Sequence, residues 1–456
     1  MAGLPRPAVA PPPAWSFPKP VRFVLDNGLR VQLYHLPGQY VISAGIALDV
    51  PLAAEPRDRE GVAGLVAATL DQGTRSHPGA SFADAVERCG AVWQATIHHG
   101  GTQVYVDVPG SRLADALPLL AEALLEPDLL DADVARERAI TLAEIEQHLA
   151  TSAGRADQVL RSSIVDARYR ASRLRDGEPA TLRTVTGDDV RAFHAEHYGP
   201  QGATLVLAGD FPSDPAALVE ATFGGWTNPA QRPASHEVPR PGPRELLLVD
   251  RPGSVQADVR MARFTIDRHD PRWADLQIAA YALGGAFLSR LNSVLREEKG
   301  YTYGVHAVTA PLRSSGYTTV SGSFRNDAVA DAVATIPGLL DVTARPLTPR
   351  EVDDARTYLL GVQPLQYATA AGVCNGVMSL VTAGLDPEFV DRLRAAYERV
   401  TPESATRVTA ELLPPAELSL VVVGDSGVLA GPLGEHGFDV TVVRAAAEAP
   451  LSVPSP

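Results

Sequence analysis

The side chains best suited to chemistry lie in two segments that are far apart in the chain. Glu137 and Glu144 lie seven residues apart in a predicted long helix, so they point nearly the same way, about 20° out of line. They are either an ordinary solvated helix face or have a role at an interface. Arg296 and Tyr303 flank Gly300, which we expect to end a helix. A guanidinium is a rigid, permanently charged donor, and a fixed hydroxyl donor can stabilise negative charge that develops in a reaction.

The histidines make weaker candidates. His194 and His197 lie one helical turn apart with Glu196 between them, but two imidazoles without a third ligand nearby do not favour a metal site. His98 and His99 are adjacent at the edge of a predicted strand, where neighbouring side chains point to opposite faces. No G-x-S-x-G, Walker or G-x-G-x-x-G motif is present. We therefore expect no metal to be bound by this chain.

Composition limits the possible functions. The chain has 456 residues, is 45% hydrophobic and carries a net charge of −14, without the concentrated basic block that a nucleic-acid partner requires. Its two cysteines, Cys89 and Cys374, are too few for a disulfide scaffold and are expected to be buried. No secretory signal pattern and no uninterrupted apolar run of about 18 residues occurs. We expect a cytoplasmic protein with no membrane partner.

The elements that must position these side chains follow one order in each half of the chain. In the first half, residues 22–36 predict a hairpin about Asp26-Asn27-Gly28, followed by a strand over 41–50 and a buried helix over 61–70. The pattern continues as a strand over 102–108 and helices over 111–125 and 131–149. In the second half we expect strands over 245–249 and 255–264 and a helix over 273–283.

A repeat connects the two halves. The stretch 317–340 resembles 101–125 and aligns Ala330-Asp331-Ala332 with Ala114-Asp115-Ala116, an offset of 216 residues. Such a repeat indicates duplication of an α+β unit. The predicted order is a proline-rich disordered or extended arm over 1–20, a domain over 21–226, a proline-rich linker over 227–243, a second domain over 244–446 and a flexible tail over 447–456.

The segment Gly61 to Thr74 reads GVAGLVAATLDQGT. It is similar to the zinc helix of the pitrilysin/insulinase-type metallopeptidase family, G-[LI]-A-H-x-x-E-H-x-x-x-x-G-T, with Gly64, Ala67 and Ala68 at the His, Glu and His positions. Three other segments also resemble the family: LRDGEPATLRTVTGDDVRAFHAEHYGPQGATLVLAGDF, PGSVQADV and LGGAFLSRLNSVLREEKGYTYGV. The resemblance spans residues 22–424 and implies two homologous α/β sandwich domains, each internally split, with antiparallel-rich sheets, forming half of a clamshell chamber.

The same resemblance assigns roles to the candidate residues. Glu144, 76 residues after Ala68, lies where the family has its third zinc ligand, and Glu137 matches a second carboxylate that the family often keeps. Arg296 and Tyr303 match an Arg/Tyr pair in which Arg holds a substrate carbonyl and Tyr donates to the oxyanion. A catalytic zinc needs three protein ligands and an open position, so one carboxylate without two imidazoles excludes a working site in this chain.

The resemblance implies a non-catalytic subunit of a heterodimeric peptidase. Its partner would be a homologous catalytic subunit with an intact H-x-x-E-H helix and the zinc, to which this chain supplies Arg296 and Tyr303 in trans for hydrolysis of a peptide substrate. Two alternatives remain open, a catalytically inert structural scaffold and a peptide-binding or chaperone-like homodimer. Glu137 and Glu144 are then relic carboxylates or part of a solvated surface.

Overall fold

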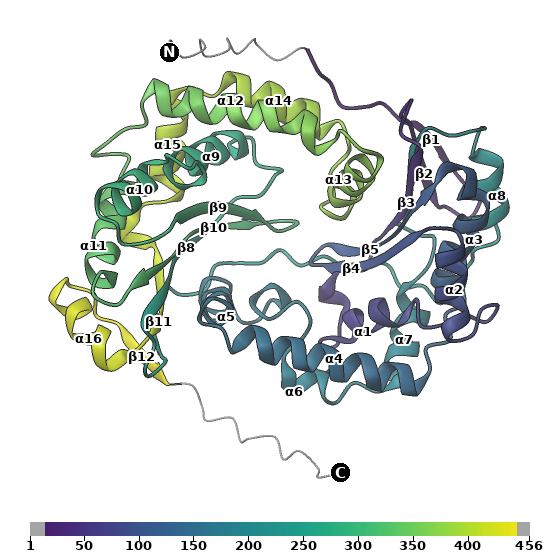
Figure 1. The fold of residues 1–456 in the computed structure, drawn as a ribbon, viewed down its shortest axis with the longest axis horizontal. Coiled ribbons are helices and arrows are strands. Elements are labelled where there is room, and N and C mark those ends of the chain that lie inside the picture. The colour runs from purple at the N-terminus through teal and green to yellow at the C-terminus, as the bar shows by residue number, and fades with distance from the viewer. Residues whose placement is uncertain (1–13, 445–456) are drawn as a thin grey trace, which may run out of the picture.

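The computed structural model describes residues 14–444, which form two six-stranded mixed sheets at opposite ends of the molecule (Figure 1). The predicted tail over 447–456 and most of the predicted arm lie outside the described residues. The prediction of an α+β fold with two antiparallel-rich sheets is confirmed.

The first sheet has the order β1-β2-β6-β3-β5-β4. Its strands are β1 (Val21–Val24), β2 (Arg30–His35), β3 (Val41–Leu48), β4 (Val92–His98), β5 (Gly101–Pro109) and β6 (Thr204–Gly209). The helices in the first half of the chain are α1 (Val62–Thr69), α2 (Ala80–Arg88), α3 (Leu113–Leu125), α4 (Asp131–Leu149), α5 (Ser152–Ile164), α6 (Pro179–Leu182), α7 (Gly187–His197) and α8 (Ala216–Phe223). The predicted hairpin is present, and Gly28 in its turn has φ 91°, a conformation that favours glycine.

The second sheet has the order β12-β7-β11-β8-β10-β9. Its strands are β7 (Leu246–Asp250), β8 (Gln256–Thr265), β9 (Val305–Pro311), β10 (Gly316–Arg325), β11 (Ser419–Gly424) and β12 (Thr441–Arg444). The helices in the second half of the chain are α9 (Trp273–Ala280), α10 (Arg290–Asn292), α11 (Val329–Leu340), α12 (Pro349–Gln366), α13 (Ala370–Thr382), α14 (Phe389–Arg399), α15 (Pro402–Leu412) and α16 (Ser426–Glu435).

The two sheets share five strands in one order, which supports the predicted duplication. The order β2-β6-β3-β5-β4 corresponds strand by strand to β7-β11-β8-β10-β9. Helices α3 and α11 follow equivalent strands, and they begin at Leu113 and Val329, which have the predicted offset of 216 residues. The sixth strands differ, because β1 pairs antiparallel with β2 whereas β12 pairs parallel with β7.

The central strands are buried on both faces. In β6, Leu205 and Leu207 join the core under the helices of the first half, whereas Val206 and Ala208 pack with α13. Because successive side chains of a strand point to opposite faces, a strand buried on both faces is apolar throughout, as TLVLAG is. Strand β11 repeats the pattern, with Leu420 in one core cluster and Val421 in another.

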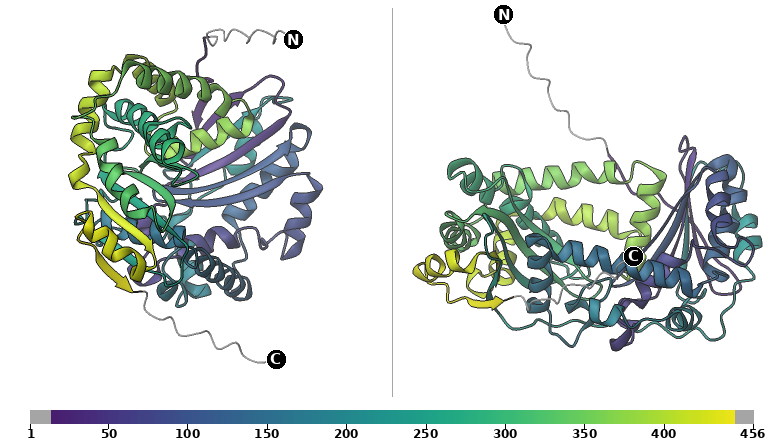
Figure 2. Two further views of the ribbon diagram at one scale, coloured as in Figure 1. Left: turned by 60° about the vertical axis from the view of Figure 1, so that its left-hand side comes forward. Right: turned by 60° about the horizontal axis from the view of Figure 1, so that its bottom comes forward.

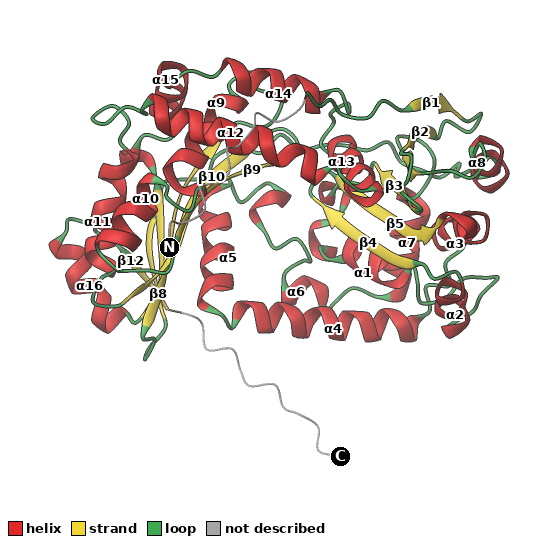
Figure 3. Ribbon diagram, turned by 45° about the horizontal axis from the view of Figure 1, so that its top comes forward, coloured by secondary structure: helices red, strands yellow, loops and turns green. Residues whose placement is uncertain are grey.

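Each half lends one helix to the sheet of the other half. Helix α13, late in the chain, packs on the first sheet through Val373, Cys374 and Val377, and α5 packs on the second sheet through Ala156 and Leu160 (Figures 1 and 2). Helix α4 spans the distance between α2 and α5 and ends beside α5 (Figure 3). The prediction of domains that follow one another in sequence did not anticipate this exchange, and the predicted domain boundaries stay predictions.

Three smaller expectations can be compared with the structure. Cys89 and Cys374 are buried free thiols, as predicted. Residues 227–243 contain no helix or strand, only a bridge between Pro241 and Val165. The helical segment Trp273–Glu298 is long and apolar enough to cross a membrane by length and composition, but 61% of its most apolar window is buried in the protein. That burial is typical of a core helix.

Candidate functional site

Helix α1 keeps the shape of a metal-binding helix without any ligand on it. Gly64 and Ala68 are half-buried, and Ala67 is 6% exposed. A Cβ atom at Gly64 would lie 3.3 Å from Cδ1 of Ile97, so β4 lies close to this face of the helix. Among residues 14–444, no group of three or more His, Cys, Asp or Glu side chains could hold a metal ion. The residues present at this position therefore do not fit zinc.

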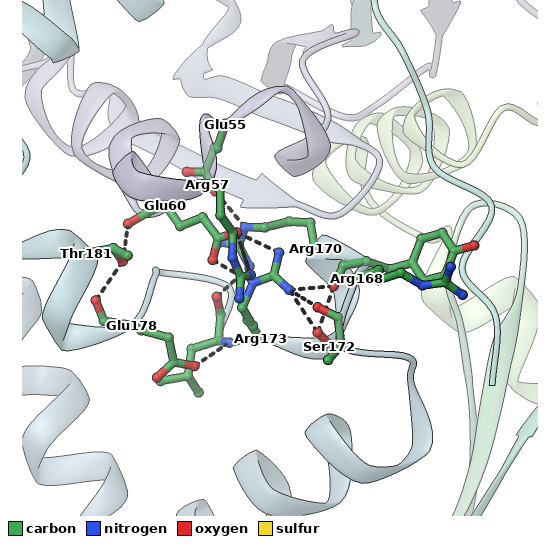
Figure 4. Close-up of polar contacts among 12 residues, drawn as sticks. Glu55, Arg57, Glu60, Arg168, Arg170, Ser172, Arg173, Glu178 and Thr181 are labelled. Carbon is green, nitrogen blue, oxygen red and sulfur yellow. Dashed lines mark hydrogen bonds and ion pairs between the residues drawn. The ribbon is translucent and has the colours of Figure 1, made fainter. Parts of the chain in front are cut away.

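A buried ion pair fixes the start of α1 (Figure 4). The Glu55 carboxylate accepts hydrogen bonds from the backbone N–H groups of Gly61 and Ala63, both at 3.0 Å, and from Nε of Arg170 at 2.7 Å. The Glu55 side chain is fully buried, and that of Arg170 is 3% exposed. Burial raises the pKa of Glu55, against the effect of the guanidinium. The guanidinium also donates to the carbonyls of Leu174 and Arg175, so its charge is well satisfied.

A second pair lies beside the first (Figure 4). Arg173 donates to both oxygens of the Glu60 carboxylate, at 2.6 and 2.7 Å, and Arg57 approaches the same carboxylate at 3.2 Å. The hydroxyl of Thr181 donates to the backbone carbonyl of Glu60. The segment after α5 thus holds the loop before α1 in place. Sequence reasoning missed this network, because the paired residues are more than 100 positions apart and no periodicity connects them.

The two carboxylates predicted on α4 have different surroundings. Glu137 is half-buried and pairs with Arg136 at 3.4 Å, and burial raises its pKa, with a smaller contribution from the nearby Asp71 carboxylate. Glu144 is exposed. Helix α4 packs against α1, and the role that the resemblance assigns to these carboxylates stays a prediction. They lack the imidazoles that would complete a metal site.

The Arg296 side chain is engaged by its own segment. Its guanidinium lies 3.6 Å from the ring centroid of Phe287, and one of its terminal N–H groups donates to the Phe287 carbonyl at 2.9 Å. Its Nε donates to Glu297 at 2.8 Å. The Arg296 side chain is 13% exposed, whereas the Phe287 residue is 74% exposed. The guanidinium is therefore stacked, paired and mostly covered by groups that are themselves at the surface.

Tyr303 presents the opposite picture, because it is 97% exposed. It lies at the edge of a groove of about 670 Å³ on the second sheet, together with polar residues of β8, β9 and β10 such as Arg260, His306 and Arg325. Asp258 also lines the groove, so both signs of charge are present there. Arg296 is not among the residues that line this groove.

The helix that carries Arg296 is wound more loosely than predicted. Residues Tyr281–Gly285 and Ser293–Glu298 are π-helical, on either side of a turn, and the second of them includes Arg296. Gly300 follows with φ 63°, as expected for a residue that ends a helix. Such π-turns are rare and occur frequently at functional sites. The regular-helix pattern could not reveal this irregularity.

The histidine pairs have structural surroundings. His194 lies 2.9 Å from the carbonyl of Leu124 through Nε2, and the His197 ring lies 4.4 Å from that of Phe193. His99 is half-buried beside Arg161, 3.1 Å from its guanidinium. Burial, with a further contribution from the Arg161 charge, lowers the pKa of His99 to about 3. The structure does not bring these rings together as ligands.

Comparisons with known proteins agree with this geometry. Residues 30–176 match the model described as Insulinase (Peptidase family M16), and residues 184–359 match the model described as Peptidase M16 inactive domain. An uncharacterized zinc protease of Mycobacterium tuberculosis is 27% identical over 350 residues, which cover 75% of this chain and 78% of that protein.

Two crystal structures share the fold of this chain. One is a peptidase M16 inactive domain from Pseudomonas fluorescens, with a TM-score of 0.82 and 21% identity over 89% of this chain and 98% of that one. The other is a protease from Helicobacter pylori, with a TM-score of 0.81 and 17% identity over 90% of this chain and 100% of that one.

Proposed function

Because the chain belongs to the M16 peptidase family, to which insulinase belongs, we propose that it is the non-catalytic subunit of a heterodimeric zinc metallopeptidase. Its partner is a homologous subunit with an intact H-x-x-E-H helix, which holds the zinc. This chain encloses the peptide substrate from the other side of the chamber and supplies Arg296 and Tyr303 to the partner's site. The substrate and its cleavage specificity are left open by this proposal.

One observation carries the proposal: the start of α1 is fixed by buried charges although its metal-binding face is empty. Removing charges from water is costly, and a pair such as Glu55 and Arg170 is retained only where good geometry offsets that cost. In the proposed heterodimer, the firmly held α1 keeps this wall of the chamber intact without a metal. The exposure of Tyr303 supports the same proposal, because its hydroxyl is available to a second molecule.

In this arrangement the two candidate residues act on different parts of the peptide. The Tyr303 hydroxyl donates a hydrogen bond to the oxyanion that forms at the cleaved carbonyl, and Arg296 holds a backbone carbonyl of the substrate. Arg296 must first exchange its contact with the Phe287 carbonyl or with Glu297 for the substrate. Both surrounding groups are at the surface, so the exchange needs no rearrangement of the core.

The test is to co-purify this chain with an M16 protein that has an H-x-x-E-H helix and to measure peptide hydrolysis. We expect Tyr303→Phe to lower kcat by about 10²-fold or more, since loss of one preorganised oxyanion donor typically costs 10²–10³. Arg296→Ala should lower turnover comparably. Tyr301→Phe and Lys299→Ala, which alter the same segment, are the matched controls and should leave kcat near the wild-type value. The Tyr303→Phe and Arg296→Ala variants must both still co-purify with the partner.

An inert scaffold is the second candidate, and the engagement of Arg296 favours it. A guanidinium that stacks on Phe287 and pairs with Glu297 has a structural explanation that requires no substrate. Full turnover by a complex that contains either Arg296→Ala or Tyr303→Phe would contradict the proposed role and support the scaffold.

A further inference from the structure

A second cavity lies in the C-terminal half of the chain, among α9, α12, α13 and α14. Its volume is about 330 Å³, near the lower end of the range of about 300–1,000 Å³ that holds small-molecule ligands. Aliphatic and aromatic side chains form much of its wall, including Leu359, Leu380, Phe389 and Leu393. It is distinct from the groove beside Tyr303, with which it shares no lining residue.

Arg268 brings an unbalanced positive charge to this cavity. Its Nε atom is buried without a hydrogen-bond partner, and no ion pair of residues 14–444 includes its guanidinium. The adjacent carboxylate, Asp267, is directed to His269, to which it bonds at the backbone N–H and at the ring. Arg272, four residues on, shows the usual arrangement, because it pairs with both Asp270 and Glu411. The Arg268 residue is half-buried, and burial lowers the pKa of its guanidinium.

Three further residues that line the cavity can donate hydrogen bonds, Trp273, Gln277 and Gln363. Trp273 is 3% exposed, and its indole N–H has no partner. The side-chain oxygen of Gln277 accepts from the Tyr397 hydroxyl, and that of Gln363 accepts from Arg394 at 3.2 Å. These contacts use the side-chain oxygen of each glutamine, so the amide N–H groups of both side chains can still donate hydrogen bonds. A buried donor without an acceptor is costly, and two such donors, Nε of Arg268 and the Trp273 indole N–H, belong to residues that line this cavity.

No acidic residue balances them, because no Asp or Glu is among the described residues that line the cavity. An anion is the ligand that such a donor set recognises, and the apolar wall calls for a hydrophobic body attached to it. We propose that this cavity binds a carboxylate that carries an aliphatic or aromatic group. The carboxylate lies against Arg268 and the Trp273 indole N–H, and the apolar group lies against the leucines and Phe389.

Two sources could supply this chemistry, a free small organic acid or the C-terminal residue of a peptide with an apolar side chain. Isothermal titration calorimetry on the purified full chain distinguishes them with two probes, 3-phenylpropionate and N-acetylphenylalanine. Tighter binding of the first assigns the cavity to a free acid, and tighter binding of the second assigns it to a peptide end. No partner subunit or peptidase activity enters the measurement, so its result is independent of the proposed function.

The unaltered protein gives the first test of the charge. We expect 3-phenylpropionate to bind at least about 10-fold more tightly than 3-phenylpropanamide, which has the same ring without the negative charge. Equal affinity for acid and amide would overturn the proposal. So would the absence of binding by both acids up to about 1 mM.

Two variants locate the binding. Arg268→Gln should weaken binding of the acid about 10-fold or more, and Trp273→Phe, which keeps an aromatic ring but removes one donor, should weaken it about 3-fold or more. Arg350→Gln, at an exposed position of α12, is the matched control and should bind like the wild type. If the acid binds to both cavity variants with unchanged affinity, the ligand lies elsewhere and the proposal is wrong.

Discussion

Arg296 and Tyr303 lie seven residues apart, yet their polar groups are used differently. The Arg296 guanidinium is stacked and hydrogen-bonded within its own segment, whereas the Tyr303 ring is almost fully exposed. A preorganised donor is most effective where water is excluded, so an exposed Tyr303 hydroxyl gains strength only when a second molecule covers it. The proposal that a partner subunit completes this site therefore assigns the covering of Tyr303 to that partner.

His99 should make the stability of the folded protein depend on pH. Its imidazole is half-buried next to the guanidinium of Arg161, so a second positive charge is strongly disfavoured there. The folded protein keeps this ring neutral down to a pKa of about 3, whereas the unfolded chain protonates it near its ordinary value of about 6.5. The unfolded state therefore binds more protons between these values, and stability falls as pH falls.

We expect His99 to contribute about 2 kcal/mol of lost stability on going from pH 7.5 to pH 5. Chemical denaturation at both pH values, on the wild type and on His99→Gln, measures this contribution as a difference. The variant should lose less stability than the wild type by about that amount, and His35→Gln at an exposed position should behave like the wild type. Parallel losses in wild type and His99→Gln would show that the ring is protonated in the folded state.

At the scale of elements, α1 is retained by its surroundings rather than by its own sequence. Its first residues have no side-chain cap, and Glu55 from the preceding loop supplies the acceptor for Gly61 and Ala63. Arg170 then compensates the Glu55 charge across more than 100 residues of chain. The helix that has no metal chemistry is consequently still held at a fixed place against α4 and α7.

Removing Arg170 should therefore destabilise the protein strongly. Arg170→Met leaves Glu55 as a buried charge without a partner, which typically costs about 3–5 kcal/mol of unfolding free energy. Arg168→Met makes the same change two residues away, where the ion pair with Asp166 is exposed, and should have little effect. Denaturant titration of both variants checks the expectation. Similar stability of the two would mean that Glu55 is protonated or hydrated when its partner is removed.

At the scale of the whole molecule, the exchange of α5 and α13 makes the two halves one structure. Each sheet is completed by a helix that belongs, in chain order, to the other half. Residues 14–20 add to this connection, since Phe17 packs with Tyr367 and its N–H donates to Asp391. We therefore expect the sheets to unfold together.

Leu160→Ala tests this coupling at the contact between α5 and the second sheet. Leu160 is 3% exposed, and truncating such a residue costs about 2–5 kcal/mol. We expect far-UV circular dichroism and tryptophan fluorescence to follow one coincident transition, shifted as a whole in the variant. Leu365→Ala, at a position that is 74% exposed, is the control and should unfold like the wild type. Two transitions, of which only one responds to Leu160→Ala, would show that the halves are separate folding units.

Local patterns in the amino-acid sequence predicted a number of the helices and strands, and they showed that the metal ligands of the family's zinc helix are absent. Hairpin turns, alternation and helical periodicity are local properties, which is why the hairpin about Gly28 and the helix over 131–149 were predicted correctly. Likewise Gly64, Ala67 and Ala68 carry no metal-ligating atoms in any fold. The family resemblance added the order of the halves and the candidate pair Arg296 and Tyr303.

The contacts between residues that are far apart in the chain could be identified only from the folded structure. The pairing of Glu55 with Arg170, the exchange of α5 and α13, and the donor-lined cavity around Arg268 all join residues far apart in the chain. Such contacts follow from how apolar faces are buried together, and no local pattern records them. The structure also separated Arg296 from Tyr303 in exposure, because side-chain surroundings depend on packing and not on spacing.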